Sequence, residues 1–217
     1  MAGDRTPWGI KQILPEDVTL VAVSKTKPAD DIIAAYKHGQ RQFGESYVQE
    51  AVTKVTALAD YKDIIWHFIG PIQSNKTKLI SQHFDWVQSV DREKIAQRLN
   101  DQRPKGLPAL NVCIQVNIND EESKSGLNIQ EVETIAQLIH RLPHLTLRGL
   151  MTIPKAAQSP EELDASFLAM SALFKQLQVQ YPSMDTLSMG MSGDIESAIR
   201  NGATLVRVGT ALFGQRL

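Results

Sequence analysis

The chain has 217 residues, of which 42% are hydrophobic and 22% are charged, a composition typical of a soluble globular protein with one core. Its 23 lysines and arginines nearly balance its 24 aspartates and glutamates, which argues against a nucleic-acid or anionic-lipid partner. The single cysteine, Cys113, excludes disulfides within the chain, and its place in an apolar run predicts a buried thiol.

Residues 1–17 contain two glycines and two prolines, so they are predicted to form a short, irregular N-terminal segment. Their start lacks the basic and apolar parts of a secretory signal. No stretch of the chain approaches the roughly 20 apolar residues that a membrane span needs. We therefore expect a cytoplasmic protein without a membrane-bound segment.

The first predicted strand, residues 18–23, is a short apolar run rich in β-branched residues, typical of a strand buried on both faces. Lys25 follows it directly, where the backbone is anchored and the amine is partly desolvated. Desolvation lowers the pKa of a lysine amine, which favours imine formation with a carbonyl cofactor. The alternative is that Lys25 and Lys27 are ordinary solvated loop lysines.

Strand-like runs and amphipathic stretches alternate along the rest of the chain. The predicted strands lie near residues 20–23, 42–43, 65–69, 86–89, 112–116, 147–151, 186–189 and 205–208. The predicted helices include residues 32–37, 48–58, 94–100, 132–142, 163–181 and 195–200. This alternation implies a parallel sheet, and eight units predict a closed (β/α)₈ barrel of the TIM type.

No linker interrupts this pattern, so residues 1–217 are expected to form one domain. The helix after the eighth strand should be very short, because the chain ends at Leu217. An open doubly wound sheet is the alternative fold, but no glycine-rich phosphate fingerprint follows the first strand.

Two loops after the last strands are candidates for binding a phosphate group. Ser192 and Gly193 follow the seventh predicted strand, and Gly209 and Thr210 follow the eighth. These small residues leave backbone amides accessible, and this is the usual phosphate site of such barrels. The alternative is that Ser192 or Asp194 is simply an N-cap and Gly209 a turn residue.

Two polar residues fall inside predicted strands. Alternation points Arg207 inward, where it needs either a carboxylate or an acceptor nitrogen of a ligand. His67 is expected to be a hydrogen-bonded core histidine rather than a ligand. The histidine spacings match no familiar metal site, so no metal is predicted. A nucleophile elbow and a nucleotide P-loop are also absent from the sequence.

Several long motifs follow one another from residue 21 to residue 214. They read VAVSKTKP (21–28), FGESYVQE (43–50), WHFIGPIQSNK (66–76), NIN (117–119), SKSG (123–126), RGLM (148–151), LSMGMSGD (187–194) and VRVGTALFG (206–214). In these motifs the chain resembles the pyridoxal-phosphate homeostasis protein family, whose fold is like the barrel domain of bacterial alanine racemase.

The resemblance implies pyridoxal 5′-phosphate (PLP) as the cofactor, held as a Schiff base on Lys25. It further implies that Arg207 faces the pyridine nitrogen and that the phosphate is bound by Ser192, Gly193, Gly209 and Thr210. The implied function is intracellular PLP homeostasis: the protein would hold the reactive aldehyde, buffer it and hand it on. PLP-dependent apo-enzymes are candidate recipients, and a monomer is the default state.

The chain departs from the family pattern in two places. Position 46 is serine, where the family usually has an asparagine against the cofactor, so a contact there is lost or bridged by water. Ser46 is therefore not predicted as a site residue. Family members also usually carry a helix before the first strand, for which residues 1–17 look too short and broken.

A PLP-dependent amino-acid racemase is the alternative function. An arginine at the ring nitrogen keeps that nitrogen unprotonated, which weakens the ring as an electron sink, although alanine racemase also has an arginine there. Racemisation further needs a proton donor opposite Lys25. In racemases this is a tyrosine from an additional C-terminal domain, whereas this chain is expected to end with the barrel. Tyr47 is the only tyrosine predicted near the C-terminal end of a strand, and helix packing explains it equally well. We therefore expect a binding protein and assign no catalytic residue.

Overall fold

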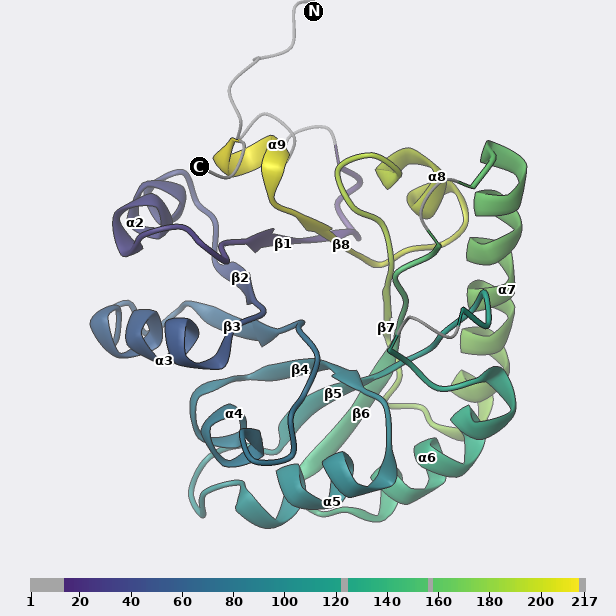
Figure 1. Ribbon diagram of the computed structural model, residues 1–217, viewed down its shortest axis with the longest axis horizontal. Coiled ribbons are helices and arrows are strands. Elements are labelled where there is room, and N and C mark those ends of the chain that lie inside the picture. The colour runs from purple at the N-terminus through teal and green to yellow at the C-terminus, as the bar shows by residue number, and fades with distance from the viewer. Residues whose placement is uncertain (1–13, 122–124, 156–157, 215–217) are drawn as a thin grey trace, which may run out of the picture.

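The computed structural model describes residues 14–121, 125–155 and 158–214, in which eight parallel strands close into a barrel (Figure 1). The strands are β1 (Thr19–Val23), β2 (Gln42–Glu45), β3 (Ile65–Phe68), β4 (Trp86–Val90), β5 (Leu110–Gln115), β6 (Leu145–Met151), β7 (Thr186–Ser188) and β8 (Leu205–Val208). Each strand pairs with the next, and β8 pairs with β1. The predicted barrel is thus confirmed, and the open sheet is wrong.

The helices lie outside the ring of strands (Figure 1). They are α2 (Ala29–Lys37), α3 (Val48–Ala57), α4 (Thr77–His83), α5 (Glu93–Gln102), α6 (Ile129–Arg141), α7 (Pro160–Gln180), α8 (Ile195–Arg200) and α9 (Thr210–Phe213). The short α9 after the eighth strand agrees with the expectation from the sequence.

Most of the N-terminal segment predicted to be irregular, residues 1–13, lies outside the described residues. Within the part that is described, the Val18 N–H donates to the Pro15 carbonyl (3.0 Å) and closes a turn before β1. No helix among the described residues is long and apolar enough to cross a membrane.

Alternation along the strands separates two environments. On β8, Val206 and Val208 belong to the apolar core between strands and helices, whereas Arg207 between them lines a cavity inside the barrel. On β1, Ala22 belongs to the same core and Val23 lines the same cavity. The outer layer therefore supplies most of the apolar burial, which leaves the barrel interior available for polar side chains.

Gly149 allows β6 and β7 to approach closely. It lies opposite Thr186 in the register of the two strands. A Cβ atom at this position would lie 1.6 Å from the Thr186 carbonyl oxygen, a distance that no side chain can occupy. The close approach of β6 and β7 therefore requires glycine in the motif at residues 148–151.

Cys113 on β5 is fully buried, as predicted, and burial raises the pKa of its thiol to about 12. At about pH 8 the reactive thiolate is then only ~10⁻⁴ of the total. We expect a thiol reagent to label the native protein very slowly and the unfolded protein at once, which absorbance assays measure directly. Rapid labelling of the folded chain would contradict this burial.

Candidate functional site

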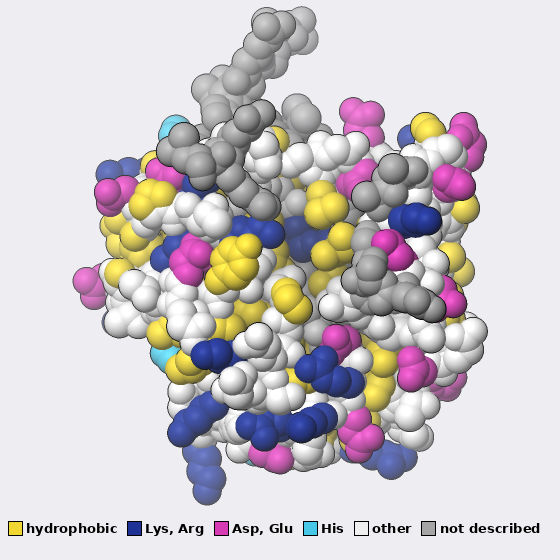
Figure 2. Space-filling view, viewed as in Figure 1, with side chains coloured by type: hydrophobic (Ala, Val, Ile, Leu, Met, Phe, Trp, Pro, Cys, Tyr) yellow, Lys and Arg dark blue, Asp and Glu magenta, His cyan; other side chains and the backbone are white. Residues whose placement is uncertain are grey.

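A cavity of about 300 Å³ lies at the C-terminal ends of the strands, near the lower limit for small-molecule sites. All the residues predicted to bind the cofactor line it, namely Lys25, Ser192, Gly193, Arg207, Gly209 and Thr210. Figure 2 shows lysine and arginine side chains in a hollow near the centre of this face, bordered by hydrophobic side chains. Positions that are up to 185 residues apart in sequence therefore meet in one space.

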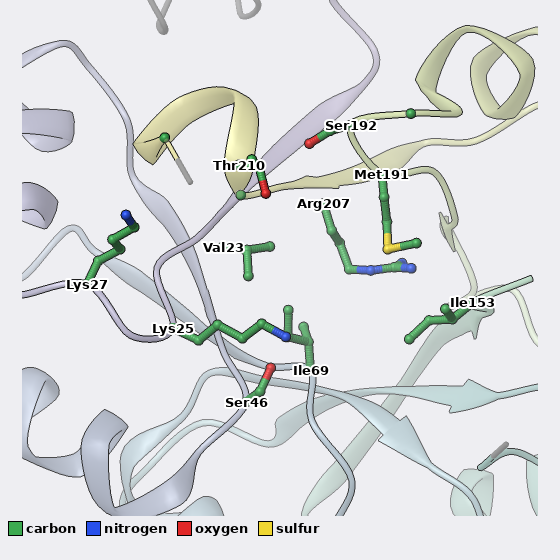
Figure 3. A pocket seen from close by; sticks show the side chains of 13 residues that line it. Val23, Lys25, Lys27, Ser46, Ile69, Ile153, Met191, Ser192, Arg207 and Thr210 are labelled. Atoms are coloured by element: carbon green, nitrogen blue, oxygen red, sulfur yellow. The ribbon is translucent and has the colours of Figure 1, made fainter. Parts of the chain in front are cut away.

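Lys25 reaches into the cavity from the loop after β1. Figure 3 shows its side chain and that of Arg207 extending into the same space, near Val23 and Ile69. Lys27 also lines the cavity, but its side chain is directed away from that space (Figure 3). The two lysines of this loop thus differ in orientation, and Lys25, the one predicted from the sequence, extends toward Arg207.

The Lys25 loop is held from behind by a buried ion pair between Glu45 at the end of β2 and Lys54 on α3. The Lys54 Nζ lies 2.9 Å from the Glu45 carboxylate and donates to the Ser24 carbonyl at 2.8 Å. The Ser24 hydroxyl donates to the same carboxylate at 2.6 Å. Burial raises the pKa of Glu45 above its usual value, and the interactions with Lys54 and Ser24 oppose this shift only in part.

The other side of the loop is held by Glu50, which accepts from the Thr26 N–H at 2.6 Å and from Lys54 at 2.5 Å. Thr26 has a φ of 66°, a strained conformation for a β-branched residue. We call Glu45, Glu50 and Lys54 the charged clamp. Because it binds the residues before and after Lys25, it fixes the backbone from which that amine extends.

The prediction from sequence missed the charged clamp. Glu45 and Glu50 stand in the motif at residues 43–50, and Glu50 is four residues before Lys54, the spacing of a helical ion pair. That spacing alone describes a surface pair, and only the fold shows that Lys54 is buried.

The loop between β7 and α8 presents Ser192 and Gly193 at its exposed tip. The Asp194 N–H donates to the Met191 carbonyl at 3.0 Å, and the Asp194 carboxylate accepts from the Met191 N–H, which closes the turn. A Cβ at Gly193 would meet no described atom within 4 Å, so the backbone there faces open space. Asp194 occupies the N-cap position of α8, but its side chain makes no capping hydrogen bond to the helix.

Gly209 and Thr210 lie at the start of α9, directly after Arg207 and Val208 on β8. Gly209 is the N-cap residue, and Thr210 is exposed at the mouth of the cavity. Gly209 therefore serves a structural role that does not exclude contact with a ligand.

Arg207 is only 4% exposed and has no carboxylate bonded to it among the described residues. Its guanidinium donates to the Thr152 carbonyl at 2.8 Å and to the Ser188 hydroxyl. Burial lowers its pKa to about 10, opposed by Asp194, so it is charged at neutral pH. Two of its five N–H groups make these bonds, which leaves donor capacity toward the cavity.

His67 is a hydrogen-bonded core histidine, as predicted. It is fully buried between Gln88 and Gln42, and burial lowers its pKa to about 3. Ser46, which was not predicted as a site residue, does line the cavity. Tyr47 is 52% exposed and is not among the described residues that line it. In the described part of the chain, no three acidic, histidine or cysteine side chains form a potential metal site.

The sequence of this chain matches a family model and several named proteins. Residues 9–217 match the family model described as the N-terminal domain of alanine racemase. The pyridoxal phosphate homeostasis protein of Vibrio alginolyticus is 57% identical over 205 residues, or 93% of this chain and 88% of that protein. The Escherichia coli (strain K12) protein of the same name is 52% identical over 204 residues, or 93% and 87%.

Solved structures agree with these matches. PipY of Synechococcus elongatus, in its structure with PLP bound, has a TM-score of 0.88 at 38% identity and covers 94% of this chain and 96% of its own. An alanine racemase of Clostridium difficile, in complex with cycloserine, has a TM-score of 0.74 at 15% identity, covering 95% of this chain and 57% of that one. The second likeness concerns the fold alone.

Proposed function

The chain belongs to the alanine racemase N-terminal domain family, in which its relatives are pyridoxal phosphate homeostasis proteins, and we propose that it binds PLP in the cavity at the barrel mouth. It would hold the cofactor on Lys25, limit the free aldehyde and release PLP to apo-enzymes. We also propose that the protein is a single domain, that it is monomeric and that it is cytoplasmic. The observation that carries the proposal is the entry of the Lys25 amine and the Arg207 guanidinium into one cavity.

The cavity fits the chemical groups of PLP. Lys25 offers an amine for the aldehyde, and Arg207 offers buried N–H donors for an acceptor such as the ring nitrogen. Gly193 faces open space, and Ser192 and Thr210 offer hydroxyls where a phosphate would lie. Each end of the ligand thus has a matching group on the protein.

The covalent step needs no further reagent. As a neutral amine, the Lys25 Nζ would attack the aldehyde carbon, and the carbonyl oxygen would leave as water with the two amine protons, so that a C=N bond remains. Hydrolysis reverses the same step, so the cofactor can be released. The charged clamp holds Lys25 in position throughout, because its bonds to Ser24 and Thr26 do not involve the Lys25 side chain.

The lining of the cavity favours binding over racemisation. A racemase needs a second proton-transfer group on the face opposite its lysine. Among the described residues, the lining contains no tyrosine, histidine, aspartate or glutamate, and its second lysine, Lys27, is directed away from the space that Lys25 enters. Its hydroxyls belong to Ser46, Ser192 and Thr210, which are poor bases without an adjacent activating group.

Trapping with borohydride tests the proposal. The protein mixed with PLP should show imine absorbance, and reduction should fix one pyridoxyl group on Lys25, which peptide fragmentation can distinguish from Lys27. Incubation of the unreduced complex with L-alanine should give no D-alanine above background. A label on another lysine would refute the assigned site, and sustained turnover would favour the racemase.

A further inference from the structure

A continuous chain of hydrogen bonds runs through the barrel interior behind Arg207. The Ser188 hydroxyl donates to the Gln88 Oε1 at 2.6 Å, and the Gln88 Nε2 lies 3.0 Å from the His67 Nδ1. The His67 Nε2 lies 2.9 Å from the Gln42 Oε1. These residues, Arg207 included, come from β8, β7, β4, β3 and β2, and we call them the interior polar chain.

The interior polar chain connects the two ends of the barrel. Arg207 lines the cavity at the mouth, while Gln42, the first residue of β2, lines a depression among the N-terminal ends of the strands. Ser188, Gln88 and His67 between them have no exposed surface. Such a row of polar groups is costly to bury unless every member is bonded.

The direction of the bonds follows from Arg207. A guanidinium can only donate, so Ser188 accepts from it and turns its own hydrogen toward the Gln88 Oε1. The Gln88 amide then donates from Nε2 to the His67 Nδ1. His67 must therefore carry its proton on Nε2 and donate to Gln42. A neutral imidazole fits this arrangement, and burial keeps His67 neutral by lowering its pKa to about 3.

We propose that Ser188, Gln88 and His67 are positioning residues that hold the Arg207 guanidinium so that its remaining donors meet the ring nitrogen of PLP. The hydrogen bonds to Ser188 and Thr152 fix the orientation of the guanidinium plane. Gln88, itself bonded to His67, fixes the orientation of the Ser188 hydroxyl. The interior polar chain thereby sets which protonation state of the ring the site accepts. This inference rests on the proposed function.

The test compares Gln88→Leu with Gln115→Leu. Both glutamines are buried in strands, but Gln115 donates to the Ser125 carbonyl and is outside the interior polar chain. We expect Gln88→Leu to bind PLP about tenfold more weakly, and to change the pH dependence of the imine absorbance, because a buried bond behind a charged donor is lost. Gln115→Leu should leave both properties unchanged.

An analogue with C–H in place of the ring nitrogen separates positioning from general damage. Gln88→Leu should bind this analogue as the unchanged protein does, within about twofold, since Arg207 has no acceptor to meet. Equal losses for PLP and the analogue, or no loss for PLP, would overturn the inference. If Gln88→Leu does not fold, Ser188→Ala carries the same comparison, because it removes the bond next to Arg207.

Nitrogen NMR of the protein without PLP gives an independent readout. His67 should carry its proton on Nε2 and stay neutral through the accessible pH range. A proton on Nδ1 would break the directed chain and overturn the inference. If the unchanged protein forms no imine with PLP, the proposed function fails. If it forms a normal imine and Gln88→Leu binds PLP as tightly as the unchanged protein does, only the positioning role is refuted.

Discussion

Replacing Lys25 with alanine should abolish the imine absorbance of the protein–PLP mixture and all borohydride-stable labelling. The reason is that Lys25 is the lysine whose side chain extends into the space shared with Arg207, whereas the other amine of the lining, that of Lys27, is directed away from it. Affinity for PLP should fall at least about a hundredfold, since only the phosphate and ring contacts remain. Absorbance titration and equilibrium dialysis measure the two effects separately.

Lys27→Ala is the matched control, because Lys27 stands on the same loop and lines the same cavity with its side chain directed away. It should keep the imine and bind PLP within a few-fold of the unchanged protein. Loss of the imine in Lys27→Ala with its retention in Lys25→Ala would exchange the roles of the two lysines and refute the site as assigned.

Replacing Lys54 with methionine should lower the free energy of unfolding by about 3–5 kcal/mol, because it leaves a buried carboxylate without its counter-ion. Glu45 has no exposed side-chain surface, Lys54 is 7% exposed, and the Glu45 Oε2 already lacks a hydrogen-bond partner among the described residues. Denaturant unfolding followed by fluorescence measures the loss. PLP binding should weaken as well, since the Lys25 loop loses its support.

The loss in Lys54→Met should depend on pH in a definite direction. Burial raises the pKa of Glu45, and removing Lys54 raises it further. Between the unfolded and the folded pKa the folded variant binds the extra proton, so its stability falls as the pH rises through that window. The deficit should therefore be smaller in mild acid than at neutral pH.

Two further variants check this interpretation. Lys62→Met alters an exposed lysine and should change stability by no more than about 0.5 kcal/mol. Glu45→Gln combined with Lys54→Met removes the stranded charge and should recover part of the loss. A Lys54→Met protein as stable as the unchanged one, at every pH, would show that the charged clamp is dispensable.

The barrel could be predicted because its pattern is local: each apolar run is followed by an amphipathic stretch, and eight such units leave few alternatives. Boundaries were less accurate, and at one strand the reason is that propensity and pairing disagree. The second strand was predicted to end near residue 43, yet β2 continues through Gly44 and Glu45, because pairing with β3 outweighs their low strand propensity.

The candidate site could be predicted to the extent that it follows from the ends of strands. Lys25, Arg207 and the two loops after β7 and β8 line one cavity because the barrel brings strand ends together. Their roles toward PLP stay predictions. The charged clamp and the interior polar chain were not foreseen, since Ser188 and Gln88 are 100 residues apart and Gln88 lies in none of the motifs named from the sequence.

The pairing of β1 with β8 has a consequence for how the protein matures. Lys25 follows the first strand, and Arg207, Gly209 and Thr210 lie on or after the last, so the groups meet only when the two ends of the sheet join. During synthesis the amine emerges early, but a chain without β8 offers no complete pocket. A bound ligand would contact groups on both sides of the β1–β8 pairing and would oppose the separation of these strands by mass action. Cofactor loading should thus report that the last strand has docked.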